Sequence, residues 1–229
     1  MMSTPPEPFR LGVLILGAGA SRRMGRPKLT LPWGATSVIG HLLDEWWETG
    51  AAQTVIVCAK DNAALHAELD RLGFPPEWRV INPAPEDGMF GSIRIGASWT
   101  EWEPNVTHIA VSLGDQPLLT TDTLRSLVAF AAQYPNSICQ PRRAGRARHP
   151  VILPRPLFQT IARAPDADFR AFLERHPSAR SYLDRDDPGL DLDLDTPEDY
   201  ERALALLSSR DTGRLSGWIS TPRSNLATP

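Results

Sequence analysis

A glycine-rich and basic segment near the start of the chain has the residue types that bind phosphate. It reads Gly17-Ala18-Gly19-Ala20-Ser21-Arg22-Arg23-Met24-Gly25-Arg26-Pro27-Lys28 and follows an apolar run at residues 11–16. Small residues let the backbone approach a ligand closely, and successive N–H groups form an anion-binding nest. The whole chain has a net charge of -3, yet four basic residues occur here within seven positions. We therefore favour an anionic ligand such as a nucleoside triphosphate over a surface turn with solvated arginines.

Two familiar phosphate-binding motifs do not fit this segment. A dinucleotide-binding fingerprint that begins at Gly17 needs a third glycine where the chain has Arg22. A Walker loop needs a lysine after its second glycine, and Gly25 is followed by arginine. The order of strand, glycine loop and helix leaves an NAD(P)-dependent oxidoreductase as an alternative, although only Asp44 or Glu45 on a packing helix could then bind the ribose.

A carboxylate follows another apolar run, residues 108–113, after a single glycine. Gly114 keeps the approach open, and Asp115 suits Mg²⁺, a hard cation that takes one or two carboxylates together with phosphate oxygens. An aspartate in a turn before proline is also common for local reasons, because it accepts hydrogen bonds from nearby backbone N–H groups. The position of Asp115 directly after a buried run favours metal binding.

Three more carboxylates alternate with leucines towards the C-terminal end of the chain. We predict a strand at residues 190–194, and Asp191, Asp193 and Asp195 would then all point one way, because residues two apart share a face. A row of carboxylates repels itself unless cations or solvent offset the charge. This row can supply the second metal ligand, whereas an edge strand with a solvated acidic face explains Asp191 equally well.

The elements that must position these residues alternate between strands and helices. Apolar runs at residues 11–16, 54–59, 79–81, 108–113 and 137–139 predict strands, and helical periodicity predicts helices at residues 36–48, 61–72 and 121–133. This alternation indicates an α/β fold with a mostly parallel sheet, and the continuous apolarity indicates strands buried on both faces. On the first helix we expect both Trp46 and Trp47 to belong to the packing face.

The chain changes character after Pro141, where we expect an insertion beside the sheet. A basic turn contains four arginines that either steer a phosphorylated substrate or are simply solvated: Arg142, Arg143, Arg146 and Arg148. A helix is predicted at residues 168–175 and another at 197–207, the latter with a capping box formed by Thr196 and Asp199.

Composition indicates one folded domain of a soluble protein. Hydrophobic residues make up 41% of the 229 residues, charged residues 22%, and the balance of charge gives no reason to expect nucleic acid or a membrane as partner. Cys58 and Cys139 are expected to be buried, reduced thiols, and the absence of a signal peptide or membrane span predicts a cytoplasmic location. We predict a disordered tail at residues 1–9, the domain at 10–208 and a mobile tail at 209–229.

The glycine-rich segment resembles the signature of the MobA-like nucleotidyltransferases, and especially that of the molybdenum cofactor cytidylyltransferases. Matching motifs run from the first strand to about residue 207: Asn82-Pro83, Gly88-Met89-Phe90-Gly91-Ser92, Leu113-Gly114-Asp115, His149-Pro150-Val151 and Asp195-Thr196-Pro197-Glu198-Asp199. The resemblance implies a single-domain, three-layer, Rossmann-like sheet of the nucleotidyltransferase (GT-A-like) type.

The resemblance also implies roles for individual residues. The nucleotide would be bound by Leu16, Gly17, Ala18, Gly19, Ser21, Arg23, Gly25, Lys28, Asn82, Ser92 and Gly114. Arg23, Lys28 and Asp115 would be catalytic, Asp115 and Asp195 would bind Mg²⁺ with Asp193 as second choice, and His149 would face the acceptor. Ser92 either contacts the ligand or caps a helix, or does both.

Three positions depart from the family pattern or discriminate within it. The family usually has two alanines and a glycine where this chain has Gly17-Ala18-Gly19, and a glycine where Arg148 precedes His149. Guanylyl-transferring relatives usually carry glycine at the position of Ala18, so this alanine favours CTP.

The implied reaction is Mg²⁺-dependent transfer of CMP from CTP to the phosphate of the molybdopterin–molybdenum cofactor, with release of pyrophosphate. A molybdoenzyme that receives the product would be a partner. The alternatives are a guanylyl or sugar-phosphate nucleotidyltransferase of the same family, the oxidoreductase named above, and a chaperone that binds molybdopterin without consuming nucleotide.

Overall fold

The computed structural model describes residues 8–211. The predicted tails, residues 1–9 and 209–229, therefore lie mostly outside the described residues. Residues of these two ranges that the structure does describe belong to the fold. The ring of Phe9 lies 4.5 Å from that of His108, and the last helix continues to Asp211.

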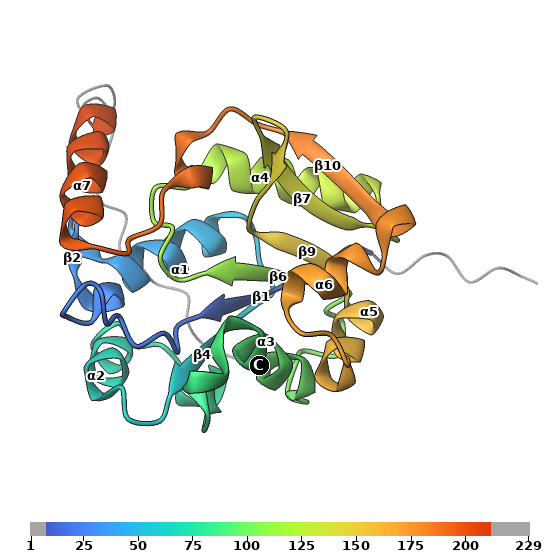
Figure 1. Ribbon diagram of the computed structural model, residues 1–229, viewed down its shortest axis with the longest axis horizontal. Helices are drawn as coiled ribbons and strands as arrows, with labels where there is room; N and C mark the ends of the chain where they lie inside the picture. The colour runs from blue at the N-terminus through green and yellow to red at the C-terminus, as the bar shows by residue number, and fades with distance from the viewer. Residues whose placement is uncertain (1–7, 212–229) are drawn as a thin grey trace, which may run out of the picture.

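The centre of the molecule is an eight-stranded, mostly parallel sheet (Figure 1). Its order is β10-β7-β9-β6-β1-β4-β5, with β8 paired to β7, and β9 runs antiparallel to both β6 and β7. The strands are β1 (Leu11–Leu16), β4 (Gln53–Ala59), β5 (Arg79–Asn82), β6 (His108–Leu113), β7 (Ile138–Arg143), β8 (Arg146–Ala147), β9 (Val151–Pro154) and β10 (Arg180–Asp184), and a separate hairpin is formed by β2 (Pro32–Trp33) and β3 (Thr36–Ser37). The predicted α/β class and mostly parallel sheet are confirmed.

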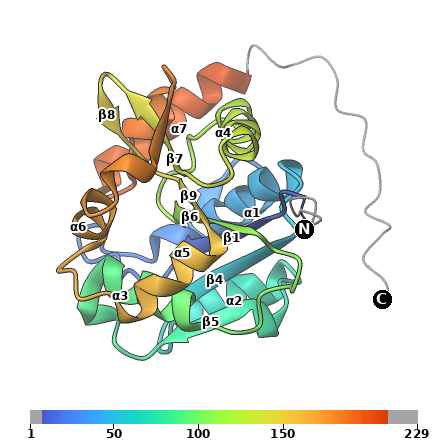
Figure 2. The same cartoon turned by 90° about the vertical axis from the view of Figure 1, so that its right-hand side faces the viewer.

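Helices cover both faces of the sheet and complete three layers (Figure 2). One face is covered by α1 (Val38–Glu48), α2 (Ala63–Arg71), α4 (Thr121–Gln133) and α7 (Pro197–Asp211), and the other by α3 (Gly88–Ser98), α5 (Arg155–Thr160) and α6 (Phe169–Glu174). Short 3-10 helices are η1 (Lys28–Thr30), η2 (Pro76–Trp78), η3 (Pro85–Asp87), η4 (Ile161–Arg163), η5 (Pro177–Ala179) and η6 (Pro188–Asp191). None of the helices in residues 8–211 has the length and hydropathy needed to cross a membrane.

Several helices begin where a side chain accepts a backbone N–H of the first turn. The Ser37 hydroxyl accepts the N–H of Gly40, and the Asp168 carboxylate that of Ala171. At α7 the Asp199 carboxylate accepts the N–H of Thr196 at 3.0 Å, while the Thr196 hydroxyl accepts that of Asp199 at 3.2 Å. The predicted capping box is confirmed.

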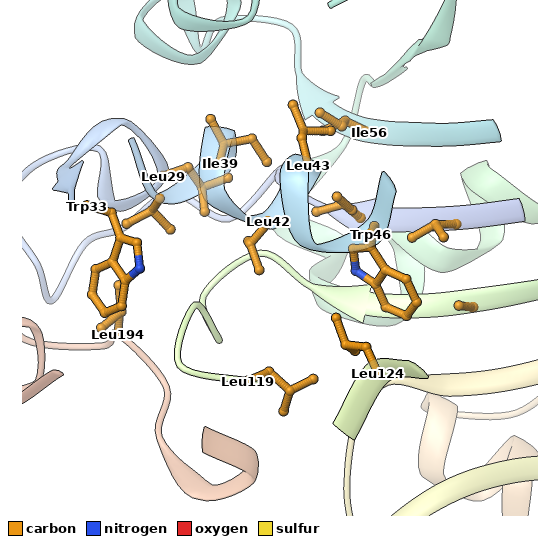
Figure 3. Close-up of a cluster of buried hydrophobic side chains, with 14 of the residues drawn as sticks. Leu29, Trp33, Ile39, Leu42, Leu43, Trp46, Ile56, Leu119, Leu124 and Leu194 are labelled. Atoms are coloured by element: carbon orange, nitrogen blue, oxygen red, sulfur yellow. The ribbon is translucent and has the colours of Figure 1, made fainter. Parts of the chain in front are cut away.

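Helix α1 carries the centre of one hydrophobic cluster (Figure 3). Leu42, Leu43 and Trp46 are buried against the sheet, and the Trp46 indole donates to the Ser112 hydroxyl at 3.1 Å. Trp47, however, is 38% exposed, so the prediction that it packs in the core is wrong. The next residue of a helix is rotated by about 100°, which takes Trp47 to the margin of the buried face.

The segment after Pro141 joins the sheet instead of lying beside it. Strand β7 continues through Arg143 into β8 by a two-residue turn in which both Ala144 and Gly145 have positive φ, 47° and 75°. Strand β9 then returns between β6 and β7, and β10 forms the edge. The hairpin was not predicted, because the arginines of this segment lack the apolar alternation that indicates strands.

The predicted strand at residues 190–194 is also wrong. Asp187 accepts the N–H of Thr120 at 3.0 Å and that of Gly189 at 2.9 Å, which folds η6 onto the start of α4. A Cβ at Gly189 would collide with the Leu118 carbonyl, so only glycine allows this approach. The strand in this region is β10, whose partly exposed residues lack the apolar run that identifies a buried strand.

Candidate functional site

A cavity of about 230 Å³ opens at the carboxyl ends of β1 and β6. These two strands are parallel neighbours, so the segments that follow them meet at one edge of the sheet. The cavity is lined by Leu16, Gly17, Ala18, Gly19, Lys28, Leu29, Pro85, Gly88, Met89, Ser92, Leu113, Gly114 and Asp115. Most of the predicted nucleotide-binding residues therefore face a single space, joined by Pro85, Gly88 and Met89, which the sequence did not single out for ligand contact.

Close backbone approach requires glycine at this edge. The N–H of Gly17 donates to the Val57 carbonyl at 2.9 Å, and that of Gly114 donates to the Leu16 carbonyl at 3.2 Å. A Cβ at Gly114 would lie 2.6 Å from the Leu16 carbonyl oxygen. The absence of a side chain at Gly114 thus lets Asp115 stand directly beside the glycine-rich loop.

The far side of the same loop faces an open groove of about 930 Å³. Ser21 and Gly25 lie along this groove and are not among the residues of the smaller cavity. Ser21 accepts the backbone N–H of Lys28 at 3.2 Å, and the Gly25 N–H donates to the Ser21 carbonyl at 3.1 Å. These contacts shape the loop and fix the backbone of Lys28.

One ammonium group links two carboxylates at the mouth of the cavity. Lys28 Nζ lies 2.5 Å from Asp115 Oδ2 and 3.6 Å from Asp195 Oδ1. Asp195 also pairs with Arg23, whose Nη2 lies 2.9 Å from Oδ2. The residues predicted to be catalytic and those predicted to bind metal are therefore brought together in one charged cluster.

These carboxylates fit a cation that arrives with phosphate. Within residues 8–211, no group of three or more His, Cys, Asp or Glu side chains is arranged to hold a metal by itself. Mg²⁺ is usually bound by only one or two carboxylates, with water and substrate phosphates completing its shell. Asp115 and Asp195 already share one cation, the Lys28 ammonium, so their oxygens suit a divalent ion at this position.

Asp193 lies next to this cluster but is held by a different partner. Gln116 Nε2 donates to Asp193 Oδ1 at 2.8 Å, and the Gln116 side chain is buried. Partial loss of water raises the pKa of Asp193, and the charges of Asp115 and Asp195 raise it further, against the opposing Gln116 bond and Lys28 charge. Gln116 was missed in the sequence, because nothing near it in the chain reveals a partner 77 residues away.

Asn82 supports the base of the cavity instead of lining it. It is 1% exposed, donates from Nδ2 to Ser92 Oγ at 3.0 Å and accepts the N–H of Ala84 at 2.9 Å. Ser92 lies in the second turn of α3 and lines the cavity, so it is not the cap of that helix. Asn82 thus orients the hydroxyl that faces the ligand space.

His149 lies on the Asp115 side of the site and lines neither cavity. Its Nδ1 is 3.4 Å from the Val111 carbonyl oxygen, and its ring is 6.0 Å from that of Phe169. Burial lowers the pKa of His149, while the Val111 contact and the charge of Asp115 oppose this shift. Burial thus favours the uncharged form of this imidazole, against the charge of Asp115.

Three of the four arginines of the basic hairpin, Arg142, Arg143 and Arg148, pair with carboxylates, and Arg146 is exposed. Arg143 Nη1 and Arg148 Nε each lie 2.5 Å from an oxygen of Asp191, and Arg142 pairs with Asp184 at 2.7 Å. The hydrogen bond from Arg143 is the main reason that the pKa of Asp191 is lowered. Asp191 thus anchors the segment that leads to Asp195 and does not face the cavity.

Both cysteines are free and buried, as expected. Burial raises the pKa of Cys58 to about 12 and that of Cys139 to about 11, so neither is a reactive thiolate.

The chain is similar to known proteins over most of its length. A family model described as MobA-like NTP transferase domain matches residues 13–180. The purine catabolism protein PucB of Bacillus subtilis (strain 168) is 28% identical, covering 88% of this chain and 99% of that one. A molybdenum cofactor guanylyltransferase of Mesorhizobium japonicum is 29% identical (86% and 95% covered), and a molybdenum cofactor cytidylyltransferase of Escherichia coli (strain K12) is 26% identical (82% and 92% covered).

Solved structures resemble the fold to a comparable extent. Rv0371c from Mycobacterium tuberculosis H37Rv superimposes with a TM-score of 0.67 at 26% identity, covering 86% of this chain and 99% of that one. A complex of Rv0371c with manganese gives a TM-score of 0.62 at 25% identity, covering 86% and 98%.

Proposed function

Because this chain belongs to the MobA-like NTP transferase family and is a nucleotidyltransferase, we propose that it transfers CMP from CTP to the phosphate of a molybdopterin–molybdenum cofactor. The reaction releases pyrophosphate and depends on Mg²⁺. The observation that carries this proposal is the contact of Lys28 with both Asp115 and Asp195 at the mouth of a glycine-walled cavity. A molybdoenzyme would receive the product.

The chemistry asks for positioning and charge neutralisation more than for covalent work. An oxygen of the acceptor phosphate attacks the α-phosphorus, a new P–O bond forms, and the bond to the β-phosphate oxygen breaks. Arg23 and Lys28 are placed to offset the charge that grows on the departing pyrophosphate. A phosphate nucleophile is already ionised at neutral pH, so no side chain has to remove a proton.

Asp115 and Asp195 would hold the metal ion. When bound, Mg²⁺ supplies Lewis-acid polarisation of the phosphate oxygens. The Gln116–Asp193 pair and His149 neighbour Asp115, and the acceptor would lie beside them. They would orient the incoming cofactor.

Ala18 supports CTP as the donor. This residue lines the cavity and is itself buried, so its methyl group takes space that glycine would leave open. The smaller ring of a pyrimidine tolerates this loss of space better than the larger ring system of a purine. Sequence identity does not decide the base, because the guanylyl and cytidylyl relatives are about equally similar.

Pyrophosphate release with purified protein, molybdopterin cofactor and Mg²⁺ tests the proposal. CTP is expected to support turnover more efficiently than GTP, ATP or UTP, and chelation of the metal should stop it. Asp115→Ala should abolish release, whereas Asp184→Asn, in an exposed ion pair of the β7 end, should leave it unchanged. A preference for GTP would favour guanylyl transfer, and binding of NADPH without any nucleotide turnover would overturn the proposal.

A further inference from the structure

Lys28 occupies an unusual position for a residue that has to act on phosphate. Its side chain is only 14% exposed, and its ammonium lies between Asp115 and Asp195, the two carboxylates assigned above to the metal. Its positive charge thus offsets part of the repulsion between the two negative groups, as the charge of Arg23 does at Asp195. The protein supplies its own cation at the place where the metal ligands meet.

A divalent ion and this ammonium compete for the same oxygen atoms. Mg²⁺ binds carboxylate oxygens at about 2.0–2.1 Å, while Asp115 Oδ2 already accepts a hydrogen bond from Lys28 Nζ at 2.5 Å. Two cations bound to one carboxylate oxygen would also repel each other strongly at such distances. Binding of the metal through Asp115 Oδ2 therefore requires Lys28 to leave that oxygen.

The backbone of Lys28 is held in place, whereas the ammonium end of its side chain can move. Its backbone N–H is held by the Ser21 hydroxyl at 3.2 Å, which fixes the start of the side chain. Four methylene groups connect this point to the ammonium, and the residue lines the cavity. The ammonium can thus exchange Asp115 for an anion in the cavity without any change in the loop.

We propose that Lys28 is an internal counter-ion that keeps the divalent cation out until the nucleoside triphosphate arrives. Without nucleotide, an incoming metal must strip Lys28 from its carboxylates and leave the ammonium unpaired. With nucleotide, the phosphates receive the displaced ammonium, so metal and nucleotide bind together. The inference rests on the proposed function, in which Asp115 and Asp195 are the metal ligands.

Binding of Mn²⁺ alone, followed by electron paramagnetic resonance, tests this competition. Lys28→Met is expected to bind Mn²⁺ about tenfold more tightly than the natural protein in the absence of nucleotide. Lys28→Arg keeps the charge and should remain weak. Lys60→Met is the matched control, because Lys60 is exposed, is the chain's other lysine and carries the same charge. An Mn²⁺ affinity of Lys28→Met that equals that of Lys60→Met would overturn the proposal.

A second measurement needs no variant and decides the matter if Lys28→Met does not fold. The natural protein is treated briefly with an amine-reactive reagent, and the labelling of Lys28 is compared with that of Lys60 by mass spectrometry. Saturating Mn²⁺ should accelerate labelling of Lys28 severalfold, and further addition of the α,β-methylene analogue of CTP should slow it again. If Mn²⁺ leaves the ratio of the two labels unchanged, Lys28 does not yield to the metal.

Pyrophosphate release, measured on the same preparations, distinguishes a failure of the proposed function from a failure of the counter-ion role of Lys28. A natural protein that turns over no nucleotide contradicts the proposed function, whatever Mn²⁺ does. A protein that turns over CTP but shows no change at Lys28 contradicts only the counter-ion.

Discussion

The backbone N–H of Leu194 donates a 2.9 Å hydrogen bond to the carbonyl of Asp115. This bond joins the turn after β6 to the segment before α7 and brings Asp115 and Asp195 to one ammonium group. Neither carboxylate alone makes the proposed metal site. The site exists because two parts of the chain that are distant in sequence meet at this bond.

The anchor of that segment is Asp191, and its loss should lower the rate without unfolding the protein. Asp191→Asn removes the charge that holds Arg143 and Arg148, so Asp195 should be positioned less well. We expect kcat to fall severalfold with a smaller change in the KM for CTP, as measured by pyrophosphate release. Asp184→Asn removes a comparable pair with Arg142 at the end of β7 and serves as control. Equal effects of both variants on kcat would contradict the positioning role.

The contact of Gly114 with β1 predicts that alanine destabilises the protein more at Gly114 than at Gly19, another glycine of the same cavity. Gly114→Ala places a Cβ 2.6 Å from the Leu16 carbonyl oxygen, whereas a Cβ at Gly19 meets nothing within 4 Å. We expect the first variant to lower the free energy of unfolding by about 1–3 kcal/mol. Gly19→Ala should change it by less than about 0.5 kcal/mol. Urea denaturation of both proteins measures this, and equal midpoints would show that the strand ends can separate without cost.

Asp187 predicts a dependence of stability on pH. Burial by itself raises its pKa, but the hydrogen bonds from Thr123, Thr120 and Gly189 outweigh burial, so the pKa of the folded protein is lowered from 3.8. A lowered carboxyl pKa stabilises the fold above the unfolded pKa, and this contribution is lost as the pH falls through the folded value. Asp187→Asn should therefore lower the free energy of unfolding by about 1–3 kcal/mol near neutral pH.

At acid pH the free energy of unfolding of Asp187→Asn should differ less from that of the natural protein. Below a pH of about 3.8 the natural carboxylate is protonated more readily in the unfolded chain, and its advantage over asparagine declines. Urea unfolding at neutral pH and at several values below about pH 4 follows this change. A gap between the two proteins that stays constant down to the lowest pH would argue that shape, and not charge, is what Asp187 contributes.

Much of the fold could be predicted because its signals are local. Strands β1 and β6 and helix α4 have the predicted bounds, since continuous apolar runs and a 3.6-residue period depend only on neighbours in the chain. The phosphate-binding loop was recognisable for a similar reason, because its glycines and basic residues are contiguous. The parallel order of the strands then placed Asp115 beside that loop.

Contacts between distant segments could not be predicted from these patterns. The alternating Asp191, Asp193 and Asp195 suggested one acidic strand face, but each has a different partner: Arg143 with Arg148, Gln116, and Arg23 with Lys28. Charge pairing depends on which segments the core brings together, and composition does not reveal which segments these are. The arginines around Asp191 were ambiguous for the same reason.

The phosphate-binding chemistry of the loop thus follows from the residue types along one short segment. The ion pairs that its charged side chains form do not follow from that segment. That Lys28 rests against Asp115 and Asp195 instead of projecting into solvent is a consequence of the sheet edge, the close approach at Gly114 and the bond from Leu194 to Asp115. Coulomb interactions act through space over a few ångströms, so only the folded chain decides which charges they join.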